Sequence, residues 1–259
     1  MIKHLVVLTA LGLTLATAAR AADQAVKIGT EADYAPFEYK DADGTLKGLE
    51  IDLAKLYCAQ AHLACTFVNM DFDGLIPALN AHQIDAAMSQ MSITDDRLKS
   101  VAFTDPVTHN DVRVVAPKGS AITADPASMK DKTIAVQSGT IEESWANAKL
   151  KGIAGEIKVY QGQDQAFEDL KAGRADATIC DEPVGYDWLQ KDGKDGYAFV
   201  GKAIEDKAIL GSGNTAIALR KDDAALAKAF NGAIAEVAKS GEFAKVNAKY
   251  FSFSLAPKP

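Results

Sequence analysis

The chain has 259 residues, of which 48% are hydrophobic and 24% charged, and its formal net charge is -7 at pH 7. This acidic balance argues against nucleic acid or anionic lipid as a partner, because both would repel the chain. The hydrophobic content is enough for one large domain or two lobes and excludes a disordered chain.

Residues 1–21 have the layout of a secretory signal. Lys3 and His4 give a basic start, residues 5–16 are almost wholly apolar, and the A-R-A sequence at 19–21 matches an A-x-A cleavage site. A membrane anchor is the alternative, but about a dozen apolar residues are fewer than the roughly 20 that span a bilayer. We therefore expect an exported chain with no direct membrane insertion.

Strand and helix patterns alternate after this segment. Residues 25–29 (AVKIG) predict a strand, and Leu49, Leu53, Leu56 and Tyr57 follow the spacing of an amphipathic helix. The alternation continues with a strand at 66–68, a helix at 74–81 and a strand at 84–88. Such alternation predicts parallel strand pairing and an α/β fold.

A second series repeats this plan. It begins with a strand at 133–137 and continues with a helix at 142–150, a strand at 157–160, a helix at 164–172 and a strand at 175–180. The two series align weakly, LNAHQIDAAMSQ with LKAGRADATICD, and the alignment places Gln90 opposite Asp181. Because ligands bind beyond the carboxyl ends of such strands, two facing lobes would form a binding cleft.

The fold class expected is therefore α/β with two lobes joined by two crossing segments. Residues 22–109 plus 212–259 are assigned to lobe 1 and residues 110–211 to lobe 2. The stretch THNDVRVV (108–115) is expected to cross between the lobes and GSGNT (211–215) to return. Helices at 223–240 and 242–250 then complete lobe 1.

The stretch SQMSITDDR (89–97) carries the first candidate site residues. Thr94 followed by two acids is typical of a helix N-cap, but this explanation does not account for Arg97, a cation in the first turn. An arginine in this place is explained if it faces an anion, and its fork binds a carboxylate through two parallel hydrogen bonds. Ser89 and Ser92 stand beside it at the strand exit.

The second lobe offers the complementary groups. Gly139 and Thr140 precede a predicted helix, where free backbone N–H groups favour an anion, although an ordinary strand-to-helix turn has the same pattern. Asp181 follows a buried strand and can hold an ammonium group. A capping or surface acid is the alternative for Asp181.

Aromatic residues supply candidate walls for a ligand side chain. Tyr34 and Phe72 can form two flat faces, although Tyr34 can also belong to a packed loop. Glu31 or Asp33 would place negative charge in the same slot.

Three cysteines follow the signal. Cys58 and Cys65 lie seven residues apart, and a helix ending between them can bring their side chains together; export permits a disulfide, and two buried thiols are the alternative. Cys180 is left without a partner. The four histidines are scattered, so no metal site is expected. The sequence GSGNTA (211–216) precedes a strand instead of following one, so no dinucleotide cofactor is expected either.

In order along the chain, ADYAPFEY, GLEIDLAKLYC, FDGLIPAL, IDAAMSQMSITDDR, FTDP, VQSGT, DLKAGRADA and CDE resemble the periplasmic amino-acid-binding proteins of ABC importers. The similarity covers essentially the whole mature chain and is strongest to the branch that binds lysine, arginine, ornithine and histidine. The resemblance implies a periplasmic binding protein with a two-lobed fold that closes on its ligand.

By the resemblance, Arg97 binds the α-carboxylate of the ligand, assisted by Ser92 and by backbone groups near Gly139 and Thr140. Ile141 departs from the family, because a second threonine often follows the G-T pair. One polar contact is therefore expected to be lost.

The resemblance also assigns the other end of the ligand. Asp181 matches the position that receives the α-ammonium, with Ser89 or Gln90 nearby. Gln90 departs from the family, in which serine is common at this position.

The resemblance assigns the ligand side chain as well. Tyr34 and Phe72 match an aromatic pair around it, and Glu31 matches an acidic position that reads a cationic tail. Cys58 and Cys65 match a disulfide of the same branch.

The expected function is capture of a basic amino acid and its delivery to the membrane permease of an ABC importer, by a monomer without cofactor or catalytic residue. An opine or a polar neutral amino acid is the alternative ligand, and presentation of a ligand to a sensory receptor is the alternative role. An enzyme similar to cyclohexadienyl dehydratase is a further alternative on the same fold, but such an enzyme has no use for an ammonium anchor such as Asp181.

Overall fold

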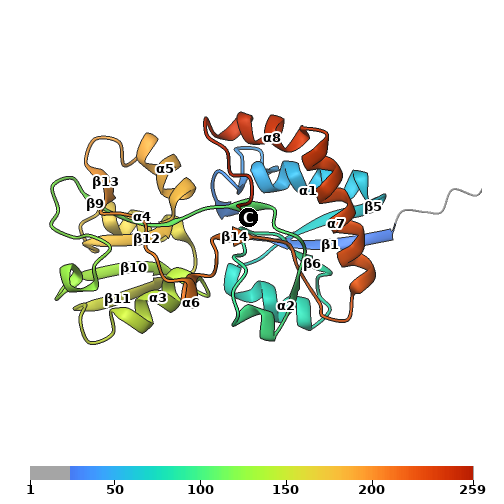
Figure 1. Cartoon of the computed structure of the whole chain (residues 1–259). Coiled ribbons are helices and arrows are strands. Elements are labelled where there is room, and N and C mark those ends of the chain that lie inside the picture. The colour runs from blue at the N-terminus through green and yellow to red at the C-terminus, as the bar shows by residue number, and fades with distance from the viewer. Residues whose placement is uncertain (1–23, 259) are drawn as a thin grey trace, which may run out of the picture.

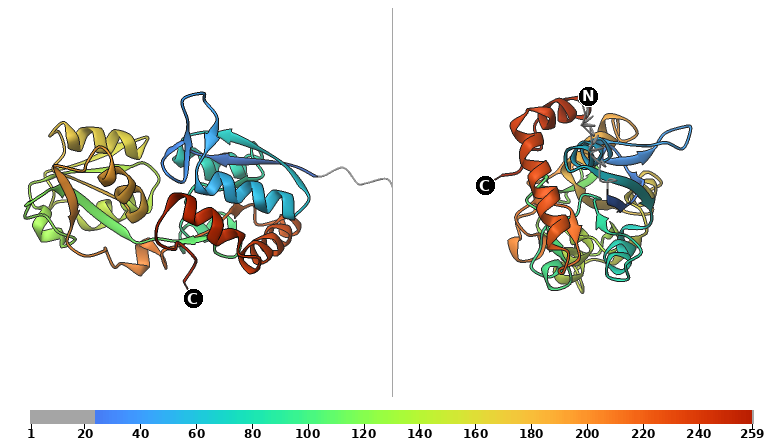
Figure 2. Two further views of the ribbon diagram at one scale, coloured as in Figure 1. Left: turned by 90° about the horizontal axis from the view of Figure 1, so that it is seen from above. Right: turned by 90° about the vertical axis from the view of Figure 1, so that its right-hand side faces the viewer.

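The structure is a computed structural model that describes residues 24–258. The predicted signal at 1–21 lies outside the described residues. The described chain folds into two α/β lobes that lie side by side (Figure 1; Figure 2), so the expected fold class is confirmed. Within residues 24–258, no helix has both the length and the apolar character that crossing a membrane requires.

The first lobe contains a five-stranded sheet with the order β5-β1-β6-β15-β7. Its strands are β1 (Gln24–Thr30), β5 (Leu63–Asn69), β6 (Ala86–Ala87), β7 (Ala102–Phe103) and β15 (Ala218–Leu219). The long strand β1 pairs in parallel with β5 and β6, whereas β15 returns antiparallel to β6. A smaller antiparallel sheet stands beside it, formed by β2 (Asp33–Tyr34), β3 (Glu38–Lys40) and β4 (Leu46–Lys47).

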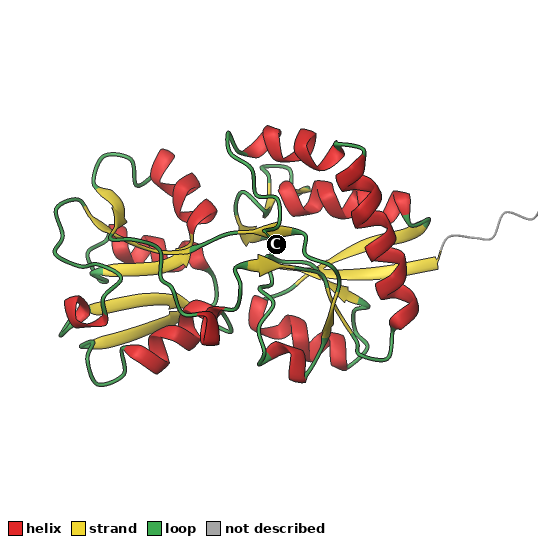
Figure 3. Cartoon of the chain, viewed as in Figure 1, coloured by secondary structure: helices red, strands yellow, loops and turns green. Residues whose placement is uncertain are grey.

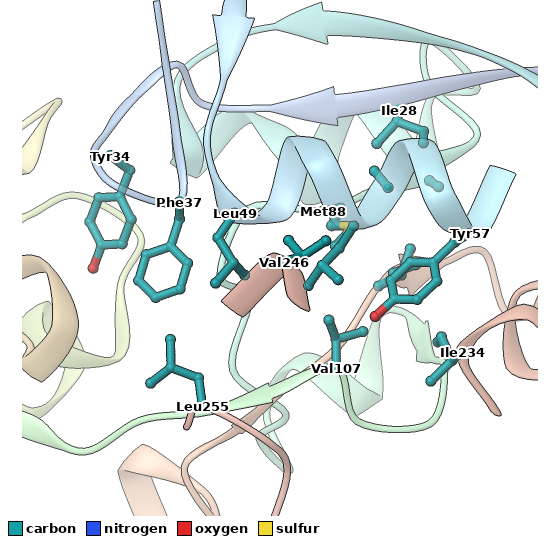
Figure 4. Close-up of a cluster of buried hydrophobic side chains, with 14 of the residues drawn as sticks. Ile28, Tyr34, Phe37, Leu49, Tyr57, Met88, Val107, Ile234, Val246 and Leu255 are labelled. Carbon is teal, nitrogen blue, oxygen red and sulfur yellow. The ribbon is translucent and has the colours of Figure 1, made fainter. Parts of the chain in front are cut away.

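Helices from both ends of the chain cover the first sheet. They are α1 (Leu49–Gln60), α2 (Leu75–Asn80), α7 (Ala224–Lys239) and α8 (Glu242–Tyr250), together with the 3-10 helices η1 (Phe72–Gly74) and η2 (Arg97–Lys99). Figure 4 shows Leu49 and Tyr57 of α1 in the same apolar cluster as Ile234 of α7 and Val246 of α8. The two C-terminal helices therefore pack against α1 of the first lobe.

The second lobe repeats the architecture with the strand order β11-β10-β12-β9-β13. Its strands are β9 (Val112–Pro117), β10 (Thr133–Gln137), β11 (Glu156–Tyr160), β12 (Ala177–Asp181) and β13 (Tyr197–Val200). Its helices are α3 (Ile141–Lys149), α4 (Gln163–Lys171), α5 (Glu182–Gln190) and α6 (Lys207–Leu210), with the 3-10 helix η3 (Pro126–Met129). Figure 3 shows that helices flank the strands of both lobes.

Two short strands run side by side where the chain passes between the lobes. The strand β8 (Thr108–His109) pairs antiparallel with β14 (Asn214–Thr215), and the hydroxyls of Thr108 and Thr215 lie 2.6 Å apart. We propose the lobe boundaries at 109/110 and 211/212, close to this pair. The C-terminal segment runs along the same strands, since Asn214 donates to the carbonyl of Lys258 at 3.0 Å (Figure 1).

Several expected elements differ from the structure in their bounds. The strand expected at 66–68 runs from Leu63 to Asn69, and the strand expected at 175–180 runs from Ala177 to Asp181. The strand expected at 84–88 contains only Ala86 and Ala87. The helix expected after Thr94 is wrong: Thr94 Oγ1 accepts a hydrogen bond from the Arg97 backbone at 3.2 Å, but only a 3-10 turn follows. The turn has no apolar stripe to bury, because Leu98 is 42% exposed, and burial of such a stripe is what stabilises most protein helices.

Candidate functional site

A cavity lies between the two lobes and is lined by residues from both. It is narrow in this structure, with about 10 Å³ of room for water-sized spheres. Every predicted ligand residue except Gly139 lines it. Its lining residues are Glu31, Tyr34, Phe72, Ser89, Gln90, Ser92, Arg97, Gln137, Thr140, Ile141, Glu142 and Asp181.

Arg97 brings a cation into this cavity. Its Nη1 donates to the carbonyl oxygen of Ser92 at 2.9 Å, and its Nη2 donates across the cleft to the carbonyl oxygen of Gly139 at 3.2 Å. The guanidinium lies over the ring of Phe72, with 5.3 Å between Cζ and the ring centroid. Burial lowers the pKa of Arg97. Because carbonyl oxygens only partly offset its charge, the guanidinium favours a small anion beside it.

Asp181 brings a carboxyl to the same cavity from the end of β12. It is only 4% exposed, so the alternative of a surface acid is wrong. Its Oδ2 accepts a hydrogen bond from the hydroxyl of Tyr34 at 2.9 Å, and its Oδ1 accepts one from the side-chain amide of Asn110. Burial raises the pKa of Asp181 to about 6. A buried carboxylate of this kind can hold an ammonium group.

Glu31 places a second carboxyl at another part of the lining. Both of its carboxylate oxygens accept from Nε2 of Gln137, each at 2.7 Å, and this contact joins the first lobe to the second. Burial raises the pKa of Glu31 to about 8. Asp33, the other acid considered for this slot, is exposed and is not among the cavity-lining residues.

Two further glutamates support the cavity from beneath. Ser89 Oγ donates to Glu38 at 2.7 Å, and the backbone N–H of Gln90 donates to Glu50 at 2.7 Å. Burial is the main cause that raises the pKa of Glu50 to about 7, and burial followed by the neighbouring Glu50 charge raises that of Glu38 well above its usual range. These acids fix the turn that presents Ser89 and Gln90, and Ser89 in turn accepts from the Glu31 backbone at 3.1 Å.

Gln90 connects the cavity to the crossing strands. Its Oε1 accepts from the hydroxyl of Thr108 at 2.8 Å and from that of Thr215 at 2.9 Å, so one amide holds both strands. A serine side chain is too short to reach both hydroxyls. The departure at this position therefore has a structural consequence at the hinge.

Gly139 occupies a different place from the other predicted residues. Its backbone N–H donates to Glu143 at 2.7 Å, so in this structure the N–H is not free for an anion. Its φ is 74°, and a Cβ would lie 2.8 Å from that of Asp73, so the close approach of the lobes requires glycine. Thr140 caps α3, because its Oγ1 accepts from the Glu143 backbone at 3.1 Å.

Gln137 and Glu142 are cavity residues that the sequence analysis missed. Gln137 ends β10 as Asp181 ends β12, so the rule on strand ends applies to it equally. Glu142 carries no such signal, because an acid in the first turn of a helix is accounted for by the helix dipole. Ile141, predicted as the site of a lost polar contact, also lines the cavity.

The remaining expectations concern sulfur and metals. Cys58 and Cys65 form a disulfide that joins α1 to β5, so this prediction is confirmed, and Cys180 is buried as a free thiol. Residues 24–258 contain no group of three or more histidine, cysteine or acidic side chains that could hold a metal ion.

The sequence model of the protein family described as bacterial extracellular solute-binding proteins, family 3, matches residues 26–253 of this chain. The histidine-binding periplasmic protein of Salmonella typhimurium is 45% identical over 250 residues, covering 95% of each chain. The lysine/arginine/ornithine-binding periplasmic protein of Escherichia coli is 41% identical over 247 residues, covering 94% of each chain. A Salmonella typhimurium periplasmic binding protein solved for its high arginine specificity is 32% identical with a TM-score of 0.81, covering 88% of this chain and 100% of its own.

Proposed function

The chain belongs to family 3 of the bacterial extracellular solute-binding proteins, and on this premise we propose that it binds a basic amino acid between its lobes for an ABC-type permease. The observation that carries the proposal is the pair of opposite charges in one cavity. Arg97 comes from the first lobe and Asp181 from the second, and both line the space between them. A zwitterion fits this arrangement.

The α-carboxylate of the ligand binds Arg97, and the α-ammonium binds Asp181. Both charged ends lose water when the lobes close, so each must find full hydrogen bonding inside the cavity. Each charge-assisted hydrogen bond then contributes roughly 1.5 to 3 kcal/mol. Ser92 and Thr140 line the cavity beside Arg97, and Ser89 and Gln90 line it as well.

Closure of the lobes is part of the binding. The structure has polar bonds between the lobes at three places around the cavity besides Arg97: Tyr34 to Asp181 at 2.9 Å, Gln137 to Glu31 at 2.7 Å and Ser138 to Asp73 at 2.9 Å. A ligand that contacts both lobes adds to these bonds only in the closed form, so it shifts the population toward that form. The closed shape is what a permease can recognise.

The side chain of the ligand lies between Tyr34 and Phe72 and ends at Glu31. A cation beside Glu31 would restore the ionised form of a carboxyl whose pKa burial raises to about 8. This favours arginine, lysine, ornithine or histidine. A polar neutral amino acid is the second candidate, because Gln137 already donates to both oxygens of Glu31.

A thermal-shift screen, followed by titration calorimetry, decides between these ligands. Arginine, lysine, ornithine and histidine are compared with glutamine, the acidic amino acids and opines. Glu31→Gln is expected to weaken binding of the best basic ligand by about 1.5 to 3 kcal/mol, while the exposed Asp33→Asn serves as control. If no basic amino acid raises the melting temperature and glutamine or an acidic amino acid does, the proposal that Glu31 binds a cationic side chain of the ligand is wrong.

The same proposal covers location and partner. The signal layout of residues 1–21 and the periplasmic location stated for the relatives support export to the periplasm. A monomer suits a hinge that must close freely. A pull-down of the liganded protein against membrane permeases and sensory receptors separates transport from sensing.

Catalysis is not part of the proposal. The relatives that the chain matches are named as binding proteins, and the proposal assigns Asp181 to the ammonium group of a bound ligand. Incubation with prephenate or arogenate is expected to give no aromatic product, and formation of such a product would reassign the site.

A further inference from the structure

Glu142 is a buried acid in the cavity to which the proposed binding mode gives no role. It lies in the first turn of α3, is 4% exposed and lines the same space as Arg97 and Asp181. Within residues 24–258, its Oε1 accepts no hydrogen bond. A buried carboxyl oxygen without a donor is costly if the group is ionised.

The groups around Glu142 do not offset a negative charge there. Asp181 on β12 and Tyr34 on β2 line the same cavity as Glu142, and Cys180 directly precedes Asp181 on β12. Arg97 is the cation nearby, but its guanidinium donates to two carbonyl oxygens. Two adjacent buried carboxyls cannot both ionise cheaply, so one of them holds a proton.

The charges of the bound state lead to the same conclusion, which rests on the proposed function. With all groups ionised, Glu31, Asp181 and Glu142 contribute three negative charges, and Arg97 contributes one positive charge. A basic amino acid adds one net positive charge, which leaves one negative charge uncompensated in a closed cavity. One bound proton removes this excess.

We propose that Glu142 takes up one proton from solvent when the lobes close on the ligand, and that the neutral acid then donates a hydrogen bond to Asp181. When the lobes part, Glu142 faces the open cleft and is ionised at neutral pH like an ordinary glutamate, helped by the positive end of α3. Asp181 keeps its full negative charge for the ligand ammonium. The residue thus makes binding dependent on pH.

Burial supports this assignment of the proton. Loss of water around the carboxyl, and after it the charge of Asp181, raises the pKa of Glu142 well above its usual range in the closed form. The backbone N–H of Glu142 and, after it, Arg97 act in the opposite direction and are smaller effects than burial and the charge of Asp181.

The test compares Glu142→Gln with the unmodified protein by titration calorimetry with the best basic amino acid at pH 6, 7 and 8. Glutamine is neutral at every pH and needs no proton, so the variant is expected to bind more tightly than the unmodified protein. The dissociation constant of the unmodified protein divided by that of Glu142→Gln is expected to rise by about tenfold per pH unit. Effects of Glu31 cancel in this ratio, because both proteins carry it.

A total rise of less than fivefold between pH 6 and pH 8, or a falling ratio, overturns the proposal. A merely structural role of Glu142 would change affinity equally at each pH. Glu142→Ala replaces Glu142→Gln if the latter does not fold, because it also removes the titrating group, and Glu156→Gln on the exposed edge of β11 is the control. If the unmodified protein binds no basic amino acid at any pH, the proposed function fails, whereas binding with a flat ratio contradicts the role of Glu142 alone.

Discussion

The hydroxyl of Tyr34 on β2 donates a hydrogen bond to Asp181 on β12 at 2.9 Å, and this bond joins the two lobes inside the cavity. The two residues lie 147 positions apart in the sequence. Tyr34, which we propose as part of the aromatic wall, therefore also orients Asp181, which we propose as the ammonium anchor. By this proposal the same contact serves both lobe closure and ligand binding.

Tyr34→Phe keeps the aromatic wall and removes this bond. Hydrogen bonds to charged groups contribute roughly 1.5 to 3 kcal/mol, so we expect the dissociation constant of the best ligand to rise about tenfold to a hundredfold. Titration calorimetry measures the change. Tyr39→Phe, the same substitution at a half-buried position on β3, is the control, and equal effects of the two variants would contradict the role of the Tyr34 hydroxyl.

Arg97→Ala removes the cation expected to bind the carboxylate. Leaving a buried charge of the ligand without its partner costs about 2 to 5 kcal/mol, or roughly thirtyfold to several thousandfold in affinity. The exposed Lys99→Ala in the same 3-10 turn should bind normally. A change of less than threefold for Arg97→Ala in titration calorimetry would remove Arg97 from the site.

The disulfide between Cys58 and Cys65 closes a short loop, with a sequence separation of 7. A loop of this length is expected to contribute about 2 kcal/mol to the free energy of unfolding. Urea unfolding of the Cys58→Ser/Cys65→Ser variant measures the loss in free energy of unfolding. Added reductant should not lower the free energy of unfolding of this variant further. Reductant should still lower the free energy of unfolding of the Cys180→Ala variant. If it does not, the effect of reductant depends on Cys180 and not on the disulfide between Cys58 and Cys65.

Glu50 makes the stability of the ligand-free protein depend on pH. Burial raises its pKa from the ordinary 4.5 to about 7 in the folded chain. The stability that this shift contributes is fully present below pH 4.5 and is lost as the pH rises through 7. We expect the free energy of unfolding to fall by about 2 to 3 kcal/mol more in the unmodified protein than in Glu50→Gln between pH 5 and pH 8.

Glutamine at position 50 still offers an oxygen to the Gln90 backbone, so the variant should keep the fold of the unmodified protein. Urea unfolding at several pH values provides the measurement. Glu236→Gln, on the exposed side of α7, is the control and should follow the unmodified protein. If the free energy of unfolding changes with pH in the same way in Glu50→Gln and in the unmodified protein, Glu50 is not the source of the pH dependence.

Local sequence patterns predict the parts of this fold that depend on local interactions. The predicted bounds of β10 and α8 match the structure, because their apolar periodicity and flanking turns are complete within each segment. The segment after Thr94 misleads, since a capping residue with two acids indicates a helix start but says nothing about what the following residues bury.

The cavity depends on contacts between distant segments. Gln137 and Glu31 lie 106 positions apart and meet only because the lobes face one another. Arg97 is detectable in the sequence because its local element does not explain its charge, and Asp181 because it is an acid at the end of a buried strand. Glu142 is not, since its helix explains it fully and only its burial beside Asp181 sets it apart.

A crystal structure of the protein with its best amino acid ligand tests the central claim most directly. The account predicts the α-carboxylate against the guanidinium of Arg97 and the α-ammonium against the carboxylate of Asp181. A liganded structure in which both side chains point away from the bound molecule would contradict it.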